Sequence, residues 1–144
     1  MTERHLTRTA VYVLLEREDG RVFFLRRANT GWADGYLTVP AGHVDKGDRI
    51  VDAAITEARE EAGVLVRPED LAFLHVDYIR DEYVNFYFRA RRWDGEPHIG
   101  EPHLASEGLW LSPENLPEDV LPQLRHLFAC VQKGVFFSDI EREV

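Results

Sequence analysis

Three glutamates close together on one predicted helix are the residues of this sequence best suited to chemistry. Residues 49–62 carry apolar side chains at helical spacing and predict an amphipathic helix. Glu57, Glu60 and Glu61 are spaced i, i+3 and i+4, so they share a narrow arc beside the apolar stripe. Like charges at this spacing repel, and the C-terminal end of a helix disfavours negative charge. A divalent cation relieves both penalties, so the pattern predicts a Mg²⁺ or Mn²⁺ site, with a solvated acidic face as the alternative.

The segment from Gly42 to Val64 resembles the Nudix box, G-x5-E-x7-R-E-U-x-E-E-x-G-U, in which U is a bulky aliphatic residue. The positions that match outright are Gly42, Glu57, Glu60, Glu61, Gly63 and Val64. The approach to the box, at 26–29 and 35–42, also resembles that of the family. The resemblance implies a Mg²⁺-dependent hydrolase that cleaves the pyrophosphate bond of a nucleoside diphosphate linked to another moiety, either a nucleoside triphosphate or a nucleotide sugar.

Two positions depart from the box. Asp48 replaces a glutamate and is one methylene shorter. Thr56 replaces the arginine that orients the catalytic glutamates in the family, and threonine has neither the charge nor the reach for that role. Loss of such a supporting residue typically costs about 10–100-fold. Arg49 or Arg59 could substitute, and the alternative is a weak or inactive Nudix domain that binds nucleotides or regulates.

By resemblance, Glu57, Glu60 and Glu61 would ligate Mg²⁺, with Mn²⁺ as a second choice and the backbone carbonyl of Ala41 as a further ligand. Glu57 is the first candidate for the general base, and Glu60 belongs to the same catalytic group.

The family often takes a further catalytic carboxylate from a loop outside the box, roughly forty residues on. Glu107 is the first candidate for this role and Glu101 the second. An ordinary exposed glutamate is the alternative for each.

Substrate contacts are expected just before the box. Arg26 and Arg27 end a predicted strand and could bind a phosphate in a bidentate manner, although they could also keep a strand edge soluble. Gly42 allows the backbone to approach a ligand closely. Further candidates are His43 for substrate contact and Trp32, Tyr36 and Phe86 for stacking on a base, with ordinary packing as the alternative.

Length and composition fit a single domain, which we expect to span residues 1–144. The formal net charge of −9 disfavours a nucleic-acid partner but permits a small nucleotide whose charge a metal neutralises. Cys130, the single cysteine, lies in an apolar stretch and is expected to be a buried thiol. A different chemistry on the same fold, the isomerisation of isopentenyl diphosphate, would need a reactive cysteine nearer the box. The sequence has no apolar leader and no segment long enough to span a bilayer, so we expect a cytoplasmic enzyme with no membrane partner. The family resemblance implies that a homodimer is possible.

The remaining sequence predicts strands before and after the glutamate helix. Expected strands cover 9–15, 21–27, 36–40, 64–66, 71–80, 83–93 and 108–111, and a second helix covers 119–132. Asp48 is expected to cap the first helix and Gly63 to end it in a left-handed conformation. This order predicts an α/β fold of the α+β type, with a mixed sheet between helices in a Nudix-type α/β/α sandwich.

Overall fold

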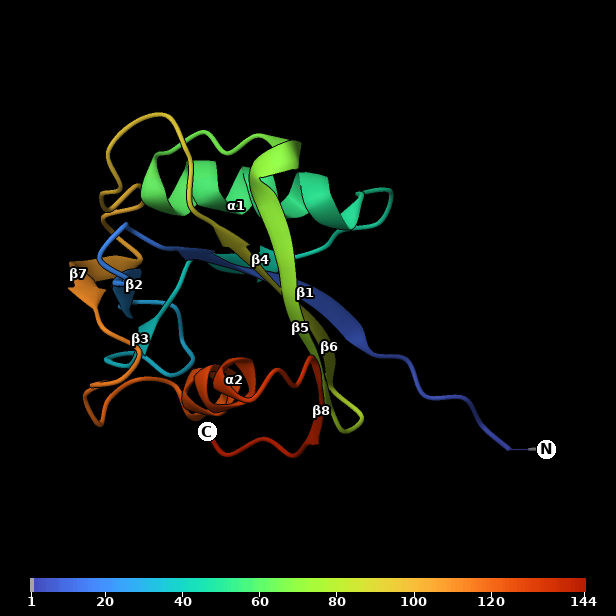
Figure 1. The fold of residues 1–144 in the computed structure, drawn as a ribbon. Coiled ribbons are helices and arrows are strands. Elements are labelled where there is room, and N and C mark those ends of the chain that lie inside the picture. The colour runs from blue at the N-terminus through green and yellow to red at the C-terminus, as the bar shows by residue number, and fades with distance from the viewer. Residues whose placement is uncertain (1) are drawn as a thin grey trace.

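The protein folds into two β-sheets with a helix on either side of the larger one (Figure 1). The structure is a computed structural model and describes residues 2–144. Its elements are β1 (Arg8–Leu15), β2 (Val22–Arg27), β3 (Leu37–Thr38), β4 (Ala41–His43), α1 (Ile50–Ala62), the 3₁₀ helix η1 (Pro68–Asp70), β5 (Leu71–Ile79), β6 (Tyr83–Ala90), β7 (Ala105–Leu111), α2 (Pro122–Gln132) and β8 (Phe137–Ile140).

The larger sheet is mixed and has the strand order β4-β1-β6-β5-β8. Strands β1 and β6 run parallel, as do β5 and β8, while the other pairs are antiparallel. The smaller antiparallel sheet has the order β3-β2-β7. In Figure 1, α1 crosses one side of the larger sheet and α2 lies on the other. The expected mixed sheet between two helices is confirmed.

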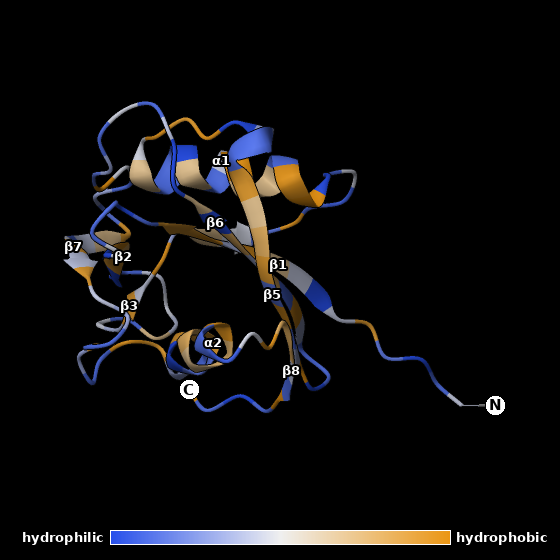
Figure 2. Cartoon of the chain, viewed as in Figure 1, coloured by the Kyte–Doolittle hydropathy of each residue, from blue (hydrophilic) through white to orange (hydrophobic). Residues whose placement is uncertain are grey.

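Alternating side chains of β1 divide the core into two parts. Val11 and Val13 belong to a cluster that also contains the buried alanines of α1, whereas Tyr12 and Leu14 belong to a second cluster that contains Leu124 and other residues of α2. Because successive side chains of a strand point to opposite faces, one strand supports both helices. Figure 2 shows hydrophobic residues along β5 and mainly hydrophilic residues in the loops.

The two ends of α1 differ from each other in how they are closed. Asp48 does not cap the helix, so that prediction was wrong: Arg49 occupies the N-cap position without a side-chain bond, and the Asp48 carboxylate accepts a hydrogen bond from the Asp45 N–H over 3.2 Å. Gly63 ends the helix with φ 68°, as expected, and its N–H donates to the Arg59 carbonyl over 3.0 Å.

Other elements also differ from the sequence-based expectation. The expected strand 64–66 reduces to a single bridge between Leu65 and Asp94. Only Leu37–Thr38 of the expected strand 36–40 forms a strand, β3, and β4 begins after it at Ala41. β8 was not expected at all, because its pairing with β5 is parallel and joins segments far apart in sequence.

The buried free thiol of Cys130 is confirmed. Within residues 2–144, no helix combines the length and the apolar composition that a bilayer crossing needs.

Candidate active site

A cavity of about 650 Å³ opens on the α2 side of the larger sheet. Its floor is formed by β1 and β6, and Ala41, Gly42 and His43 of β4 form one edge. Loops 28–36 and 91–104, helix α2 and the segment after β8 supply the remaining walls. Segments distant in sequence therefore meet at one place, beside the C-terminal end of α1.

Glu61 and Glu57 bring carboxylates from α1 to this edge. The Ala41 N–H donates to Glu61 Oε1 over 2.9 Å. A Cβ atom on Gly42 would lie 2.1 Å from Glu57 Cδ, so the Glu57 carboxylate rests directly on the glycine backbone. Because Gly42, the glycine at the start of the box, has no Cβ, the Glu57 carboxylate can pack against its backbone.

The pKa values of both carboxyl groups are raised because they share a partly buried place. Burial, together with the charges of Glu60 and Glu101, raises the pKa of Glu57 to about 7. Burial raises the pKa of Glu61 to about 8, with added repulsion from Glu57 and Glu101, while the Ala41 N–H opposes the shift. Several negative groups therefore meet here with few donors to offset them.

The loop 91–104 places Glu101 beside these carboxylates. The Gly100 N–H donates to the Glu61 carbonyl over 2.9 Å, and a Cβ on Gly100 would lie only 2.2 Å from the Glu60 carbonyl oxygen. His98 N–H donates to the Ala62 carbonyl over 3.0 Å. These bonds satisfy carbonyls that the end of α1 leaves open, and they fix the next residue, Glu101, at the cavity wall.

The donor set suits a hard divalent cation, because carboxylate oxygens predominate and their charge is poorly offset. In the part of the chain that the structure describes, residues 2–144, no three His, Cys, Asp or Glu side chains converge closely enough to form a finished metal site. Glu60 is exposed while Glu57 and Glu61 are partly buried. Side-chain rotation of Glu60 is therefore needed to gather the three glutamates around one ion.

Arg26 and Glu107 lie together outside the cavity. Arg26 Nε donates to Glu107 Oε1 over 2.9 Å, and its Nη1 donates to Asp119 Oδ2 over 2.6 Å and to the Gly35 carbonyl over 2.7 Å. Neither Arg26 nor Glu107 lines the cavity. Arg26 thus ties β2 to β7 and to the segment before α2, whereas Glu101, the second candidate for the further carboxylate, lines the cavity.

Arg27 lines the cavity, as does Gly42. Arg27 Nε donates to the Trp32 carbonyl over 2.8 Å, its Nη2 donates to Thr30 Oγ1 over 2.9 Å, and its guanidinium lies 4.9 Å from the Trp32 ring centroid. The charge of Arg27 also lowers the pKa of Glu61. Among residues 2–144, neither Arg49 nor Arg59 pairs with a carboxylate, so neither takes the place of the arginine missing at Thr56.

The aromatic candidates divide between the cavity and the core. Trp32 lines the cavity, whereas Tyr36 and Phe86 pack against the two core clusters. His43 also lines the cavity; its ring stacks on Tyr83 with centroids 5.6 Å apart, and its Nε2 shares a hydrogen bond of 2.7 Å with the Tyr83 hydroxyl.

Sequence reasoning missed several cavity residues because they lie far from the box. They are Tyr12, Tyr83, Asn85, Gln123 and Arg142. The one sequence signal for these residues was the alternation of Tyr83 and Asn85 with apolar neighbours. Such alternation shows that the two side chains share one face of a strand, but it does not show which segments pack over that face.

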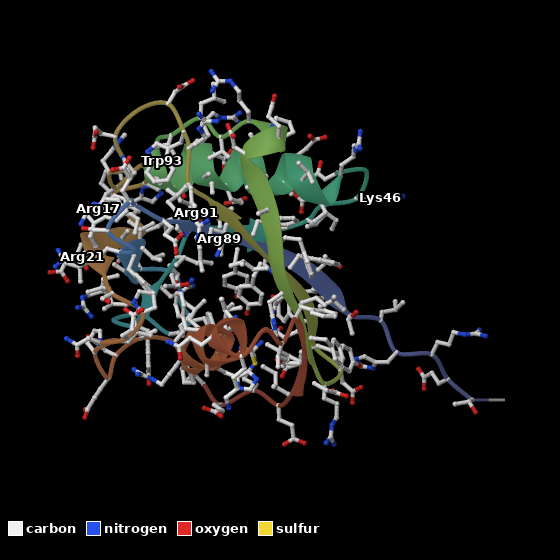
Figure 3. The ribbon with its side chains drawn as sticks, viewed as in Figure 1. Arg17, Arg21, Lys46, Arg89, Arg91 and Trp93 are labelled. Carbon is white, nitrogen blue, oxygen red and sulfur yellow. The ribbon has the colours of Figure 1, made fainter. Side chains whose placement is uncertain are left out.

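Basic residues at another part of the surface take no part in this site. Figure 3 shows Arg17, Arg89, Arg91 and Trp93 on the same side of the molecule. Arg89 and Arg91 both pair with Glu16, and the Arg17 guanidinium lies 4.2 Å from the centroid of the Trp110 ring. None of these residues lines the cavity, so their ion pairs and ring contacts stabilise the fold and do not belong to the site.

Comparisons with known proteins agree with this geometry. The chain is 28% identical over 113 residues to the 8-oxo-dGTP diphosphatase of Escherichia coli, covering 76% of this chain and 83% of that protein. It is 29% identical over 145 residues to the RNA pyrophosphohydrolase of Novosphingobium aromaticivorans, covering 86% and 89%.

Solved structures show the same fold. The MutT NUDIX hydrolase of Burkholderia pseudomallei superposes with a TM-score of 0.77 at 24% identity, covering 86% of this chain and 97% of that one. The MutT protein of Methanosarcina mazei Go1 gives 0.77 at 20% identity, covering 92% and 97%. The family model described as NUDIX domain matches residues 6–130, and the chain therefore belongs to the Nudix family.

Proposed function

We propose that this Nudix pyrophosphohydrolase uses Mg²⁺, or Mn²⁺ in its place, to cleave the pyrophosphate bond of a nucleoside triphosphate or a nucleotide sugar. The observation that carries the proposal is the gathering of acidic side chains from α1 and from loop 91–104 at one edge of a cavity with aromatic walls. Phosphate needs a cation in such an acidic place, whereas a planar base can use the aromatic walls.

The residues that would hold the metal are Glu57, Glu60 and Glu61, with the backbone carbonyl of Ala41. When bound, a hard divalent cation neutralises diphosphate charge and lowers the pKa of an attacking water. Ala41 and Glu61 already share a hydrogen bond, which keeps β4 and α1 at a fixed separation. That bond orients the Glu61 carboxylate before any ligand arrives.

Proton transfer at this edge falls to the carboxylates. Glu57 lies on Gly42 and is our choice of general base, and Glu60 completes the catalytic group. We place Glu101 ahead of Glu107 as the further catalytic carboxylate, because it reaches the cavity from a separate loop. A group on that loop can face a water from the side opposite the helix.

Arg27 would contact a phosphate of the substrate, whereas Arg26 is fully engaged by its carboxylate and carbonyl partners. Two contacts from Thr30 and Trp32 hold the Arg27 side chain in place, so little conformational entropy is lost on binding. Gly42 would let the backbone approach the diphosphate closely.

The names of the relatives favour a nucleoside triphosphate, since one is named 8-oxo-dGTP diphosphatase. The other is named RNA pyrophosphohydrolase, but the net charge of −9 favours a small nucleotide over a long polyanion here. Thr56 motivates a second candidate function, a nucleotide-binding module with little turnover.

A substrate panel tests the proposal. Purified protein is incubated with nucleoside triphosphates and nucleotide sugars in Mg²⁺. Phosphate release is followed with added inorganic pyrophosphatase for the triphosphates, and with added alkaline phosphatase for the nucleotide sugars, whose hydrolysis yields two monophosphates and no pyrophosphate. We expect turnover of at least one substrate and at least a tenfold lower kcat for Glu60→Gln. Nucleotide binding without turnover, unchanged in Glu60→Gln, would establish the binding module instead.

A further inference from the structure

Ala10 and Asn85 lie side by side in the cavity floor. Strand register places Ala10 of β1 between His43 of β4 and Asn85 of β6, and Asn85 in turn lies opposite Asp77 of β5. Ala10, His43 and Asn85 all line the cavity. Because alanine is the smallest side chain of this row, the cavity reaches the sheet beside Asn85.

Asn85 has a buried acceptor that nothing in the fold uses. The side chain is 1% exposed, and its Nδ2 donates to Asp77 Oδ1 over 2.9 Å. Within residues 2–144, no group donates to Asn85 Oδ1. Buried side-chain oxygens almost always have a donor, so this one requires an explanation.

A hydrogen-bond network through Asp77 determines the orientation of the Asn85 amide. Asp77 also accepts a hydrogen bond of 2.7 Å from the Tyr87 hydroxyl, and Gln123 Nε2 donates to the same hydroxyl over 2.9 Å. An ionised Asp77 can only accept, so it selects the NH₂ end of the amide and turns Oδ1 away from itself. The free acceptor therefore stands on the cavity side of a fixed network.

Two aromatic rings above this floor face a common space. Trp32 and Tyr83 both line the cavity, and the flat guanidinium of Arg142 lies 5.1 Å from the Trp32 centroid and 5.7 Å from the Tyr83 centroid. The Arg142 guanidinium occupies the place beside both rings, so a nucleobase that stacks there would lie against this guanidinium or take its place. The acidic edge with Glu61 belongs to the same cavity, so one ligand can extend from the rings to the carboxylates.

We infer that Asn85 selects the base of the substrate by accepting, through Oδ1, a hydrogen bond from an amino or lactam N–H on the edge of a nucleobase. The inference rests on the proposed function and adds the class of base to it. A site built around an unpaired acceptor discriminates strongly against a ligand that lacks the donor.

Matched nucleotides test this on the unaltered protein. The triphosphates of adenosine, guanosine and 2-aminopurine riboside are compared with that of unsubstituted purine riboside, which has no N–H on its ring edges. We expect kcat/KM for at least one of the first three to exceed that of the unsubstituted purine by about tenfold or more. Equal values for all four, or a preference for the unsubstituted purine, would overturn the inference while leaving the proposed hydrolysis intact.

Variants identify the residue responsible. Asn85→Leu keeps the approximate volume without the acceptor, and we expect it to remove the preference while still hydrolysing the unsubstituted purine nucleotide. Asn115→Leu, an exposed position outside the cavity, is the matched control and should retain the preference. Survival of the preference in folded Asn85→Leu would assign the selectivity elsewhere. If that variant does not fold, the comparison of the four nucleotides is the test of the inference. Absence of turnover on these four and on every triphosphate and nucleotide sugar of the substrate panel would instead refute the proposed function.

Discussion

The protein buries carboxyl groups in two places that differ in how each is compensated. Asp77 is 1% exposed and accepts hydrogen bonds from Asn85 and Tyr87 over 2.9 and 2.7 Å. Glu61 accepts one, from the Ala41 N–H over 2.9 Å, and lies close to other carboxylates. Burial raises the pKa in both places, but only at Asp77 do two side-chain donors oppose it.

The difference indicates what each group is for. A buried acid with a full set of donors is a connected part of the core, and removing it leaves those donors unpaired. Acids that repel each other beside a cavity add nothing to the fold unless a cation arrives. We therefore expect changes at Asp77 to alter stability most, and changes at the α1 glutamates to alter activity most.

The largest effect is expected for Glu61→Gln. Loss of this carboxylate should lower kcat by at least tenfold, because metal ligation is weakened. The free energy of unfolding of the metal-free variant should equal or exceed that of the wild type, since like charges no longer repel. Steady-state kinetics and urea unfolding of the same preparation would measure both; lower stability with normal kcat would reverse the distinction drawn above.

The next largest effect distinguishes the two candidates for the further catalytic carboxylate. Glu101→Gln should lower kcat by about tenfold or more, because this carboxylate lines the cavity. Glu107→Gln, its matched control, should keep kcat within about twofold, since Glu107 pairs with Arg26 elsewhere. An inactive Glu107→Gln beside an active Glu101→Gln would restore the original order.

Asp77→Ala should destabilise the fold by about 3 kcal/mol, because two buried donors lose their acceptor at about 1–3 kcal/mol each. Urea unfolding at neutral pH would measure the change. A loss below about 0.5 kcal/mol would show that the hydrogen bonds around Asp77 contribute little to the free energy of unfolding. It would contradict the claim that Asp77, unlike Glu61, serves the stability of the fold.

A smaller, pH-dependent effect is expected at Tyr12, which stacks on Tyr87 with centroids 4.7 Å apart. Burial raises the pKa of Tyr12 from 10.0 to about 12. The folded-state pKa lies above the unfolded one, so the neutral form contributes stability that is present below pH 10 and lost as the pH rises to about 12.

Over that interval the wild type should lose about 2 kcal/mol more of its free energy of unfolding than Tyr12→Phe. Urea unfolding at pH 9, 10 and 11.5 would show it. Parallel losses in both proteins would mean that Tyr12 titrates as it does in the unfolded chain.

Local spacing explains why the helix and its glutamates could be predicted from the sequence. Glu57, Glu60 and Glu61 share an arc because of helix geometry alone, and Gly63 ends the helix because glycine adopts positive φ without strain. These features depend on a few neighbouring residues and require no knowledge of the rest of the chain.

The cavity could not be predicted in the same way, because it depends on contacts between distant segments. Glu101 reaches the site through the close approach of Gly100 to the Glu60 carbonyl, and Asn85 reaches the floor through the parallel pairing of β1 with β6. Arg26 ends the same strand as Arg27, yet only Arg27 enters the cavity. Strand alternation separates such neighbours, but the sequence does not say which face holds the site.

Metal binding tests the central claim most directly, namely that the acids at the end of α1 exist to hold a divalent cation. Mn²⁺ would be titrated into the wild type and into a triple variant, Glu57→Gln, Glu60→Gln and Glu61→Gln, with free Mn²⁺ followed by electron paramagnetic resonance. We predict saturable binding in the wild type and at least a tenfold weaker Kd in the triple variant. Equal binding by both proteins, or none by the wild type even with a nucleotide present, would contradict the account.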